Sequence, residues 1–186
     1  MRTLGPRLAA GLIAAGLLLS GCGGSPEPSP PPKPSKSSAP SASATPTPPV
    51  MPEAAKAKTK AGAEASVRYF LSAMEYAGDT GDTKVFETTY TTECTRCAAI
   101  TEGIRATYAN GGSIAGGAWH PTRLKFYDIE NDIAFVDAVV DYEAQIWVKD
   151  STGTKTTSPA RQNVLKAFHL VWRDGMWRVG ALDPEA

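Results

Sequence analysis

Residues 134–148 read AFVDAVVDYEAQIWV, and this stretch decides the fold. Every second residue from Ala134 to Val148 is apolar, and the residues between them include Asp137, Asp141 and Glu143. Such alternation is typical of a β-strand with one buried face and one face largely in water. A flat strand of this length is uncommon, so we expect a long antiparallel strand with a bend.

Further strands are predicted on both sides of this stretch. Residues 123–129 read as a strand that leads through a tight turn into residue 134. Residues 150–153 signal a hairpin, and a return strand spans roughly residues 162–173. Asp174-Gly175 is the strongest short hairpin signal in the chain, and it precedes a final strand over residues 176–182. The C-terminal half therefore predicts an antiparallel sheet.

One long amphipathic helix is predicted before the strands. Pro52 suits a first helical position, and Gly78 is a plausible end. One apolar face has residues spaced three and four apart, namely Val67, Phe70, Leu71 and Met74. The first half of the segment is polar, and we expect it to project away from the body of the domain.

Two shorter helices follow in the prediction. Asp82 caps a short helix that runs to Tyr90. A third helix starts at Thr91 or Thr92, passes through Tyr108 and ends at the glycines after Asn110. Helices first and antiparallel strands afterwards indicate an α+β domain over residues 51–186, with the N-terminal helices packed on one face of a curved sheet.

This order of elements carries a resemblance. The Gly81-Asp82 turn, the short helix ending at Tyr90, the long strands and the segment 174–179 resemble the nuclear-transport-factor-2-like, cystatin-like cone fold over roughly residues 54–182. The third helix replaces a strand that this family often has there. The resemblance implies that helices and a strongly curved sheet enclose a pocket. In enzymes of this fold, which resemble steroid isomerases and dehydratases, the pocket is the active site.

The N-terminus predicts export and a lipid anchor. Arg2 and Arg7 precede an apolar run over residues 8–19 that is too short to span a bilayer, as in a secretory signal peptide over residues 1–21. The stretch Leu19-Ser20-Gly21-Cys22 resembles the lipobox of bacterial lipoproteins, which implies acylation of Cys22. The whole layout also resembles an uncharacterised lipoprotein family of high-GC Gram-positive bacteria. We therefore expect the protein on the extracytoplasmic face of the cell membrane.

Residues 22–50 form a lipid-anchored linker in this prediction. The segment is rich in Pro and Ser and has no aromatic residue, so it cannot bury enough apolar surface to fold. Dense proline favours an extended, semi-rigid spacer. A proline-rich recognition motif is the alternative, and the Ser and Thr content permits O-glycosylation.

Composition excludes some partners. The chain has 19 Lys and Arg residues and 19 Asp and Glu residues, so its formal net charge is zero. Since no run of basic residues stands out either, we expect no nucleic acid partner. Two histidines and three cysteines give no zinc-ligand pattern, and we expect neither a metal nor a cofactor. The expected partners are the membrane, through the anchor, and either an envelope protein or a small apolar ligand.

Cys94 and Cys97 have a spacing with two interpretations. Near a helix start and beside Arg96, a Cys-x-x-Cys pair can be a redox couple. Redox motifs of the thioredoxin type follow a strand in a βαβ pattern, however, and helices precede this pair. In an exported chain a structural disulfide is therefore the preferred prediction.

Three residues are hypothetical pocket residues for an enzyme of the cone fold: Asp137, Tyr142 and His169. Asp137 interrupts an apolar strand face, and His169 alternates with apolar residues on the return strand. The simpler interpretation makes Asp137 a carboxylate on the wet face and His169 a hydrogen-bonded core histidine. No nucleophile or phosphate-loop motif is present. We therefore expect a lipid-anchored binding or accessory module of the envelope and not an enzyme. The alternatives are a small-molecule enzyme of the cone fold and a structural envelope protein without a pocket.

The lipid anchor is tested by Cys22→Ala. Two or more acyl chains on one residue give stable anchoring, at about 0.8 kcal/mol per buried CH₂. We expect the parent chain in the detergent phase after detergent phase separation, and the variant in the aqueous phase. A variant that stays with the membrane would contradict the assignment of Cys22.

Overall fold

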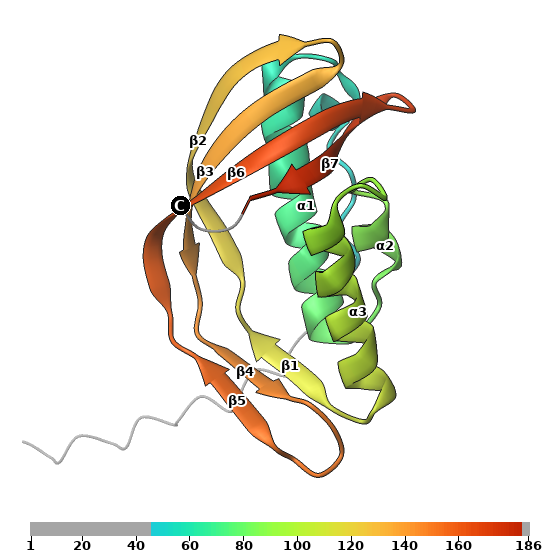
Figure 1. Cartoon of the computed structure of the whole chain (residues 1–186), viewed down its shortest axis with the longest axis vertical. Helices are drawn as coiled ribbons and strands as arrows, with labels where there is room; N and C mark the ends of the chain where they lie inside the picture. The colour runs from blue at the N-terminus through green and yellow to red at the C-terminus, as the bar shows by residue number, and fades with distance from the viewer. Residues whose placement is uncertain (1–45, 184–186) are drawn as a thin grey trace, which may run out of the picture. The chain divides into compact units, whose positions relative to one another are not determined.

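The structure is a computed structural model that describes residues 46–183 (Figure 1). The predicted signal peptide, Cys22 and most of the predicted linker lie outside the described residues. Residues 46–50, at the end of that linker, contain no helix or strand. Within the described part of the chain, no helix is long and apolar enough to cross a membrane.

The first helical segment is two helices, not the single helix predicted over residues 52–78. A short 3-10 helix, η1 (Glu53–Lys56), is followed by a break and then by α1 (Lys60–Thr80). Thr59 is the N-cap of α1, since its hydroxyl accepts a hydrogen bond from the Gly62 backbone N–H. This bond stabilises the start of a new helix after the break. The prediction that the first half projects outward is wrong, since Ala55 is completely buried.

The next two helices are shorter than predicted. The helix α2 (Lys84–Glu87) is a single turn, and α3 (Thr95–Ala109) begins after Cys94. Cys94 is the N-cap of α3, since its sulfur accepts a hydrogen bond from the Cys97 backbone N–H. The residues between α2 and α3 pair instead with the last strand, because Thr91 N–H donates to Val179 O and Val179 N–H donates to Thr89 O.

The larger sheet has four antiparallel strands in the order β2-β3-β6-β7. Their bounds are Trp119–Glu130, Ile133–Tyr142, Arg161–Arg173 and Met176–Leu182. The final strand has the predicted bounds, and β2 begins earlier than the predicted residue 123. Alternate residues of β3 point inward and are buried, namely Ala134, Val136, Ala138 and Val140, which confirms the predicted dry face.

A smaller sheet was not predicted as a separate unit. It has the order β1-β4-β5, with bounds Ser113–Gly116, Gln145–Val148 and Lys155–Ser158. The long strand predicted over residues 134–148 therefore bends, as expected, but it breaks at Glu143 and Ala144 and continues in the other sheet as β4. The strand β5 was missed because all its residues are polar and exposed.

The helices lie on one side of the curved strands (Figure 1). The helix α1 packs against the inner face of the larger sheet through Phe70, which is completely buried. The Phe70 ring lies 5.1 Å from the Phe86 ring and 5.7 Å from the Phe168 ring, centre to centre. Tilted and edge-on aromatic contacts at such distances are favourable beyond their buried area. The predicted fold class, α+β with N-terminal helices on a curved antiparallel sheet, is confirmed.

The end of α1 generates a stability prediction. Gly81 and Gly153 both have left-handed backbone, with φ of 76° and 80°. A Cβ at Gly81 would lie 2.6 Å from the Tyr108 ring, whereas nothing lies within 4 Å of one at Gly153. We expect Gly153→Ala to lower the free energy of unfolding by about 1 kcal/mol, the cost of left-handed backbone for a residue with a Cβ.

Gly81→Ala should lower it by about 3 kcal/mol, because overpacking adds to the backbone cost. Urea unfolding of both variants measures the difference. Equal losses at the two positions would show that the Tyr108 contact does not matter to stability.

Candidate binding cleft

Two chain segments pass from the smaller sheet to the larger sheet at the same place. One segment joins β1 to β2 through Gly117 and Ala118, and the other joins β3 to β4 through Glu143 and Ala144. They stay hydrogen-bonded, because Gly117 N–H donates to Ala144 O and Glu143 N–H donates to Ala118 O. We call this pair of segments the crossover.

The crossover requires glycine. Gly116 and Gly117 have φ of 67° and 82°, in the left-handed region that glycine adopts without steric cost. A Cβ at Gly116 would meet Ala144 O at 2.3 Å, and one at Gly117 would meet the Gln145 amide nitrogen at 2.3 Å. The close approach of the two segments therefore depends on the absence of a side chain at Gly116, where the contact is with backbone, whereas at Gly117 the positive φ is what favours glycine.

A cleft lies on the inner side of the crossover, against α1 and α3. Its apolar half is a cavity of about 180 Å³, whose large side chains are Met74, Ile100, Ile104, Ile114, Trp119 and Trp147. The Trp147 ring is held in place, because its Nε1–H donates to Thr107 Oγ1 over 2.7 Å and that hydroxyl donates to Gly103 O over 2.8 Å.

The polar half of the cleft is a cavity of about 340 Å³. Ile100, Gly117, Trp119 and Gln145 line both cavities, so the two adjoin, and we describe them together as one cleft. The groups that only the polar half contains are Arg96, Tyr142, Glu143, Ser158, Arg161 and Lys166, with Pro159 beside them. The cleft thus joins an apolar surface to a cluster of charged and hydroxyl-bearing side chains.

Lys166 is the most unusual of these residues. It occupies an inward position of β6 between Val164 and Phe168, and only 4% of its surface is exposed. Its Nζ lies 5.5 Å from the centre of the Trp119 ring and 5.8 Å from that of Tyr142. Both distances are within the range of cation–π attraction. The two rings meet edge to face at 4.6 Å.

Acidic groups also lie at or beside the cleft. Glu75 lines the apolar half, and Asp79 follows in the next turn of α1. Partial burial, and secondly the negative charge of Glu143, raise the pKa of the Asp79 carboxyl above its usual value. Glu143 itself lies 2.9 Å from His120 Nε2. The polar half thus contains the carboxylate of Glu143 together with the cations Arg96, Arg161 and Lys166.

The three residues predicted for a pocket do not come together. Tyr142 lines the cleft, but Asp137 and His169 point to the opposite, outer face of the larger sheet. Strand alternation explains this, because Asp137 and Tyr142 stand an odd number of positions apart on β3. The hypothesis of one pocket lined by Asp137, Tyr142 and His169 is corrected accordingly.

On the outer face both residues have partners. Asp137 accepts a hydrogen bond from the Tyr127 hydroxyl. The His169 ring packs edge-on against Phe135 at 4.8 Å, and its Nε2 lies 3.3 Å from Asp183 Oδ2. His169 is thus neither a core histidine nor a cleft residue. Exposed apolar side chains surround the pair, namely Tyr127, Ile133, Phe135 and Leu165.

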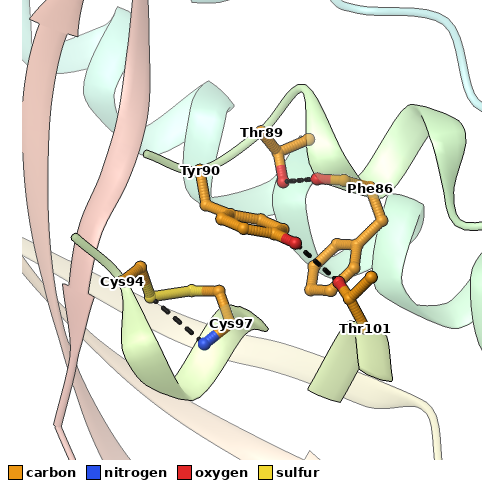
Figure 2. Close-up of a disulfide and its surroundings, with 6 residues drawn as sticks. All are labelled: Phe86, Thr89, Tyr90, Cys94, Cys97 and Thr101. Atoms are coloured by element: carbon orange, nitrogen blue, oxygen red, sulfur yellow. Dashed lines mark hydrogen bonds between the residues drawn. A yellow bond between two sulfur atoms is a disulfide. The ribbon is translucent and has the colours of Figure 1, made fainter. Parts of the chain in front are cut away.

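The disulfide between Cys94 and Cys97 is present, with Cα atoms 5.2 Å apart (Figure 2). Cys94 is 1% exposed and Cys97 is completely buried. Beside the bridge, the Tyr90 hydroxyl is hydrogen-bonded to Thr101 Oγ1 at 2.7 Å, which joins the segment before the bridge to α3 (Figure 2). The bridge thus lies where that segment turns into the helix whose first turn carries Arg96.

Sequence reasoning missed Arg96, Arg161 and Lys166 as cleft residues. For Lys166 a signal exists, because its neighbours at every second position are Val164, Phe168 and Leu170, all inward. A lysine at such a position is rarely buried without a partner or a function. The two arginines are exposed and carry no comparable signal. Within residues 46–183, no group of three or more His, Cys, Asp or Glu side chains is placed to hold a metal ion.

Comparison with known sequences gives a family but no activity. Residues 33–183 match the family described as "Family of unknown function (DUF6318)", and the chain belongs to this family. No curated protein matches it.

Solved structures with a similar fold include the intermembrane space region of the chloroplast protein ARC6, with 14% identity, a TM-score of 0.51, and coverage of 67% of this chain and 95% of that one. An NTF2-like protein with a cystatin-like fold from Novosphingobium aromaticivorans has 14% identity, a TM-score of 0.38 and coverage of 65% and 79%. An uncharacterised protein with a cystatin-like fold from Caulobacter vibrioides has 12% identity, a TM-score of 0.40 and coverage of 65% and 87%. At such identities the similarity concerns the fold alone.

The burial of the bridge generates a prediction about its role. Sulfur atoms excluded from solvent are protected from attack by a thiolate, so we expect a structural disulfide with a reduction potential below roughly −300 mV. Titration of the purified chain against defined dithiol buffers measures the potential. A value near roughly −200 mV would favour the redox couple instead.

Proposed function

We propose that this member of the family is an extracytoplasmic binding module, held at the membrane by a lipid on Cys22, that binds a small ligand in the cleft. The anchor and the proline-rich spacer are supported by the sequence of residues 1–50. The ligand site is supported by the geometry of the described domain.

The cleft is the single observation that carries the proposal. Protein interiors are normally filled at close-packed density, so an apolar cavity next to polar groups needs an explanation. Ligand sites are concave, mostly apolar, and contain a few polar groups that orient the ligand. The cleft has this composition, with Trp119 and Trp147 in one half and the charged side chains in the other. The glycine crossover and the hydrogen-bonded Trp147 ring hold it open.

Binding is preferred to catalysis of the isomerase or dehydratase type. The acid and base considered for such chemistry were Asp137 and His169, and both lie on the outer face. A general base must come within hydrogen-bond reach of the proton that it removes. Of the three hypothetical pocket residues, Tyr142 alone meets the cleft. The enzyme alternative therefore loses the pair on which it depended.

We assign no function to the outer face of the larger sheet. Its exposed apolar residues, Tyr127, Ile133, Phe135 and Leu165, resemble a surface that contacts another protein. Nothing among the described residues shows what covers that surface. The cleft, by contrast, has a shape and a set of polar groups that can be matched to a ligand.

The four tryptophans provide an internal test of the proposal. Trp119 and Trp147 line the cleft, whereas Trp172 and Trp177 pack against each other at 5.2 Å and do not line it. A panel of small aromatic and aliphatic compounds, added to the full chain with Cys22→Ala, should shift the indole N–H signals of Trp119 and Trp147 in NMR spectra. The signals of Trp172 and Trp177 should stay in place.

A variant that fills the cleft tests the site itself. Ile100 lines both halves, so Ile100→Phe should reduce the affinity of any compound found in this way by about tenfold or more, because added side-chain volume displaces the ligand. Ile146→Phe is the matched control, since Ile146 is exposed on β4 and outside the cleft. Equal effects of the two variants, or shifts only at Trp172 and Trp177, would refute the cleft as the site.

A further inference from the structure

We infer that the apolar half of the cleft binds a compact organic cation with a methylated ammonium group. Glu75 supplies the opposite charge, and the Trp147 ring supplies an aromatic surface. This inference rests on the proposed function and specifies the chemical class of the ligand.

The charge in the wall of the apolar half is the first argument. Of the described side chains that line this half, Glu75 is the only one with an ionisable group. The cations Arg96, Arg161 and Lys166 line the polar half and do not line this one. The apolar half therefore offers a ligand one carboxylate and no cation.

Further carboxylates act on the same end of α1. Asp79 stands four residues after Glu75, so the two side chains share one face of the helix. The pKa of the Asp79 carboxyl is raised by partial burial and secondly by the negative charge of Glu143. The charge of Glu143, at the crossover, thus reaches this end of α1. Carboxylates from two parts of the chain together favour a cation there.

Glu75 has no protein partner in the described part of the chain. Glu87, by comparison, forms an ion pair with Arg105. Within residues 46–183, the side chain of Glu75 takes part in no ion pair or hydrogen bond. A neutral ligand that fills the apolar half displaces water beside this carboxylate and gives it no partner, which costs free energy. A cation compensates for the lost hydration.

The Trp147 ring is the second argument. Its N–H group already donates to Thr107 Oγ1, so the ring offers the cavity a carbon surface. The face of a tryptophan attracts cations that lie within about 6 Å of the ring centre. The domain contains one such contact, because Lys166 Nζ lies 5.5 Å from the centre of the Trp119 ring. Lys166 repels a second cation placed against Trp119, so Trp147 is the ring that suits a cationic ligand.

The size and the aliphatic wall of the cavity specify the cation further. Its volume of about 180 Å³ is below the roughly 300–1,000 Å³ of drug-sized sites, so it suits a group of a few heavy atoms. Met74, Ile104 and Ile114 form part of the wall, and their side chains cannot hydrogen-bond a primary ammonium group. Methyl groups on the nitrogen remove the need for such bonds. A trimethylammonium group has this size and this surface.

A matched pair of probes tests the charge of the ligand. Choline carries a trimethylammonium group, and 3,3-dimethylbutan-1-ol has the same shape with a carbon atom in place of the nitrogen. Each is titrated into the full chain with Cys22→Ala, and the indole signals of Trp119 and Trp147 are followed in NMR spectra. We expect choline to bind about tenfold more tightly than the alcohol, because choline alone is attracted by Glu75 and by the Trp147 face.

Variants identify the residues that bind the cation. Glu75→Gln removes a charge from an exposed position of α1 and should weaken choline binding by about threefold to fivefold, without changing binding of the alcohol. Glu102→Gln is the matched control, since Glu102 is exposed on α3 and lines neither half. Trp147→Leu, followed through the Trp119 signal, should reduce the preference for choline over the alcohol. Equal choline affinities of Glu75→Gln and Glu102→Gln would overturn the inference.

A second arm identifies the source of the ammonium group, which occurs in free solutes and in lipid headgroups. Vesicles of phosphatidylcholine carry the trimethylammonium group, whereas vesicles of phosphatidylglycerol lack it. If the Cys22→Ala chain sediments with the former alone and free choline releases it, the ligand is a lipid headgroup. If the chain binds choline but sediments with neither, the ligand is a free solute. Both results support a methylated ammonium ligand.

The outcomes separate this inference from the proposed function. If 3,3-dimethylbutan-1-ol binds as tightly as choline, the cleft still binds ligands but the inference of a cation is overturned. The inference is also overturned, and the ligand site kept, if other compounds move the Trp119 and Trp147 signals and choline does not. If no compound moves these signals, both the inference and the proposed ligand site are overturned.

Discussion

The crossover between the two sheets is the constraint on which the rest of the domain depends. Two chain segments leave the smaller sheet together and stay hydrogen-bonded there, which requires that Gly116 have no side chain and that Gly117 adopt a left-handed backbone. The change of sheet bends the strands around the helices and turns their inner face into the wall of a cleft. Trp119 and Gln145 begin the strands that leave the crossover, and both line that cleft. The architecture and the candidate site thus have one physical origin.

The fold was largely predictable because burial imposes a two-residue period on strands. This period identified the inner residues of β3 and, with the Asp174-Gly175 turn, the bounds of β7. It could not reveal that β3 and β4 belong to different sheets, since the apolar alternation continues through Tyr142, Ala144 and Ile146 without a break. Alternation reports which face a side chain occupies, but it carries no information about the sheet to which the strand belongs. The break before Thr59 was missed for a related reason, because a cap in the middle of a polar, alanine-rich segment does not interrupt its helical pattern.

The site was less predictable than the fold because residue type suggested the wrong face. Asp137 and His169 attract attention as groups of acid–base chemistry, yet their strand positions place them with Phe135 on the outer face. Tyr142 shares the inner face with Val140 and Ala138 and lines the cleft. Which face would be concave depends on where the helices pack, and that is a property of the whole fold. A sequence pattern alone could not decide it.

Lys166 shows how a site can be recognised when the usual motifs are absent. A histidine or aspartate on an exposed face has water as its neighbour, so its presence there costs little and implies little. A lysine on a buried face lowers stability unless its charge is compensated, so the position is explained only by what surrounds it. Its surroundings include the rings of Trp119 and Tyr142 and the polar half of the cleft. Cation–π attraction from these rings is worth about 1–2 kcal/mol and offsets part of the cost of burying the ammonium group.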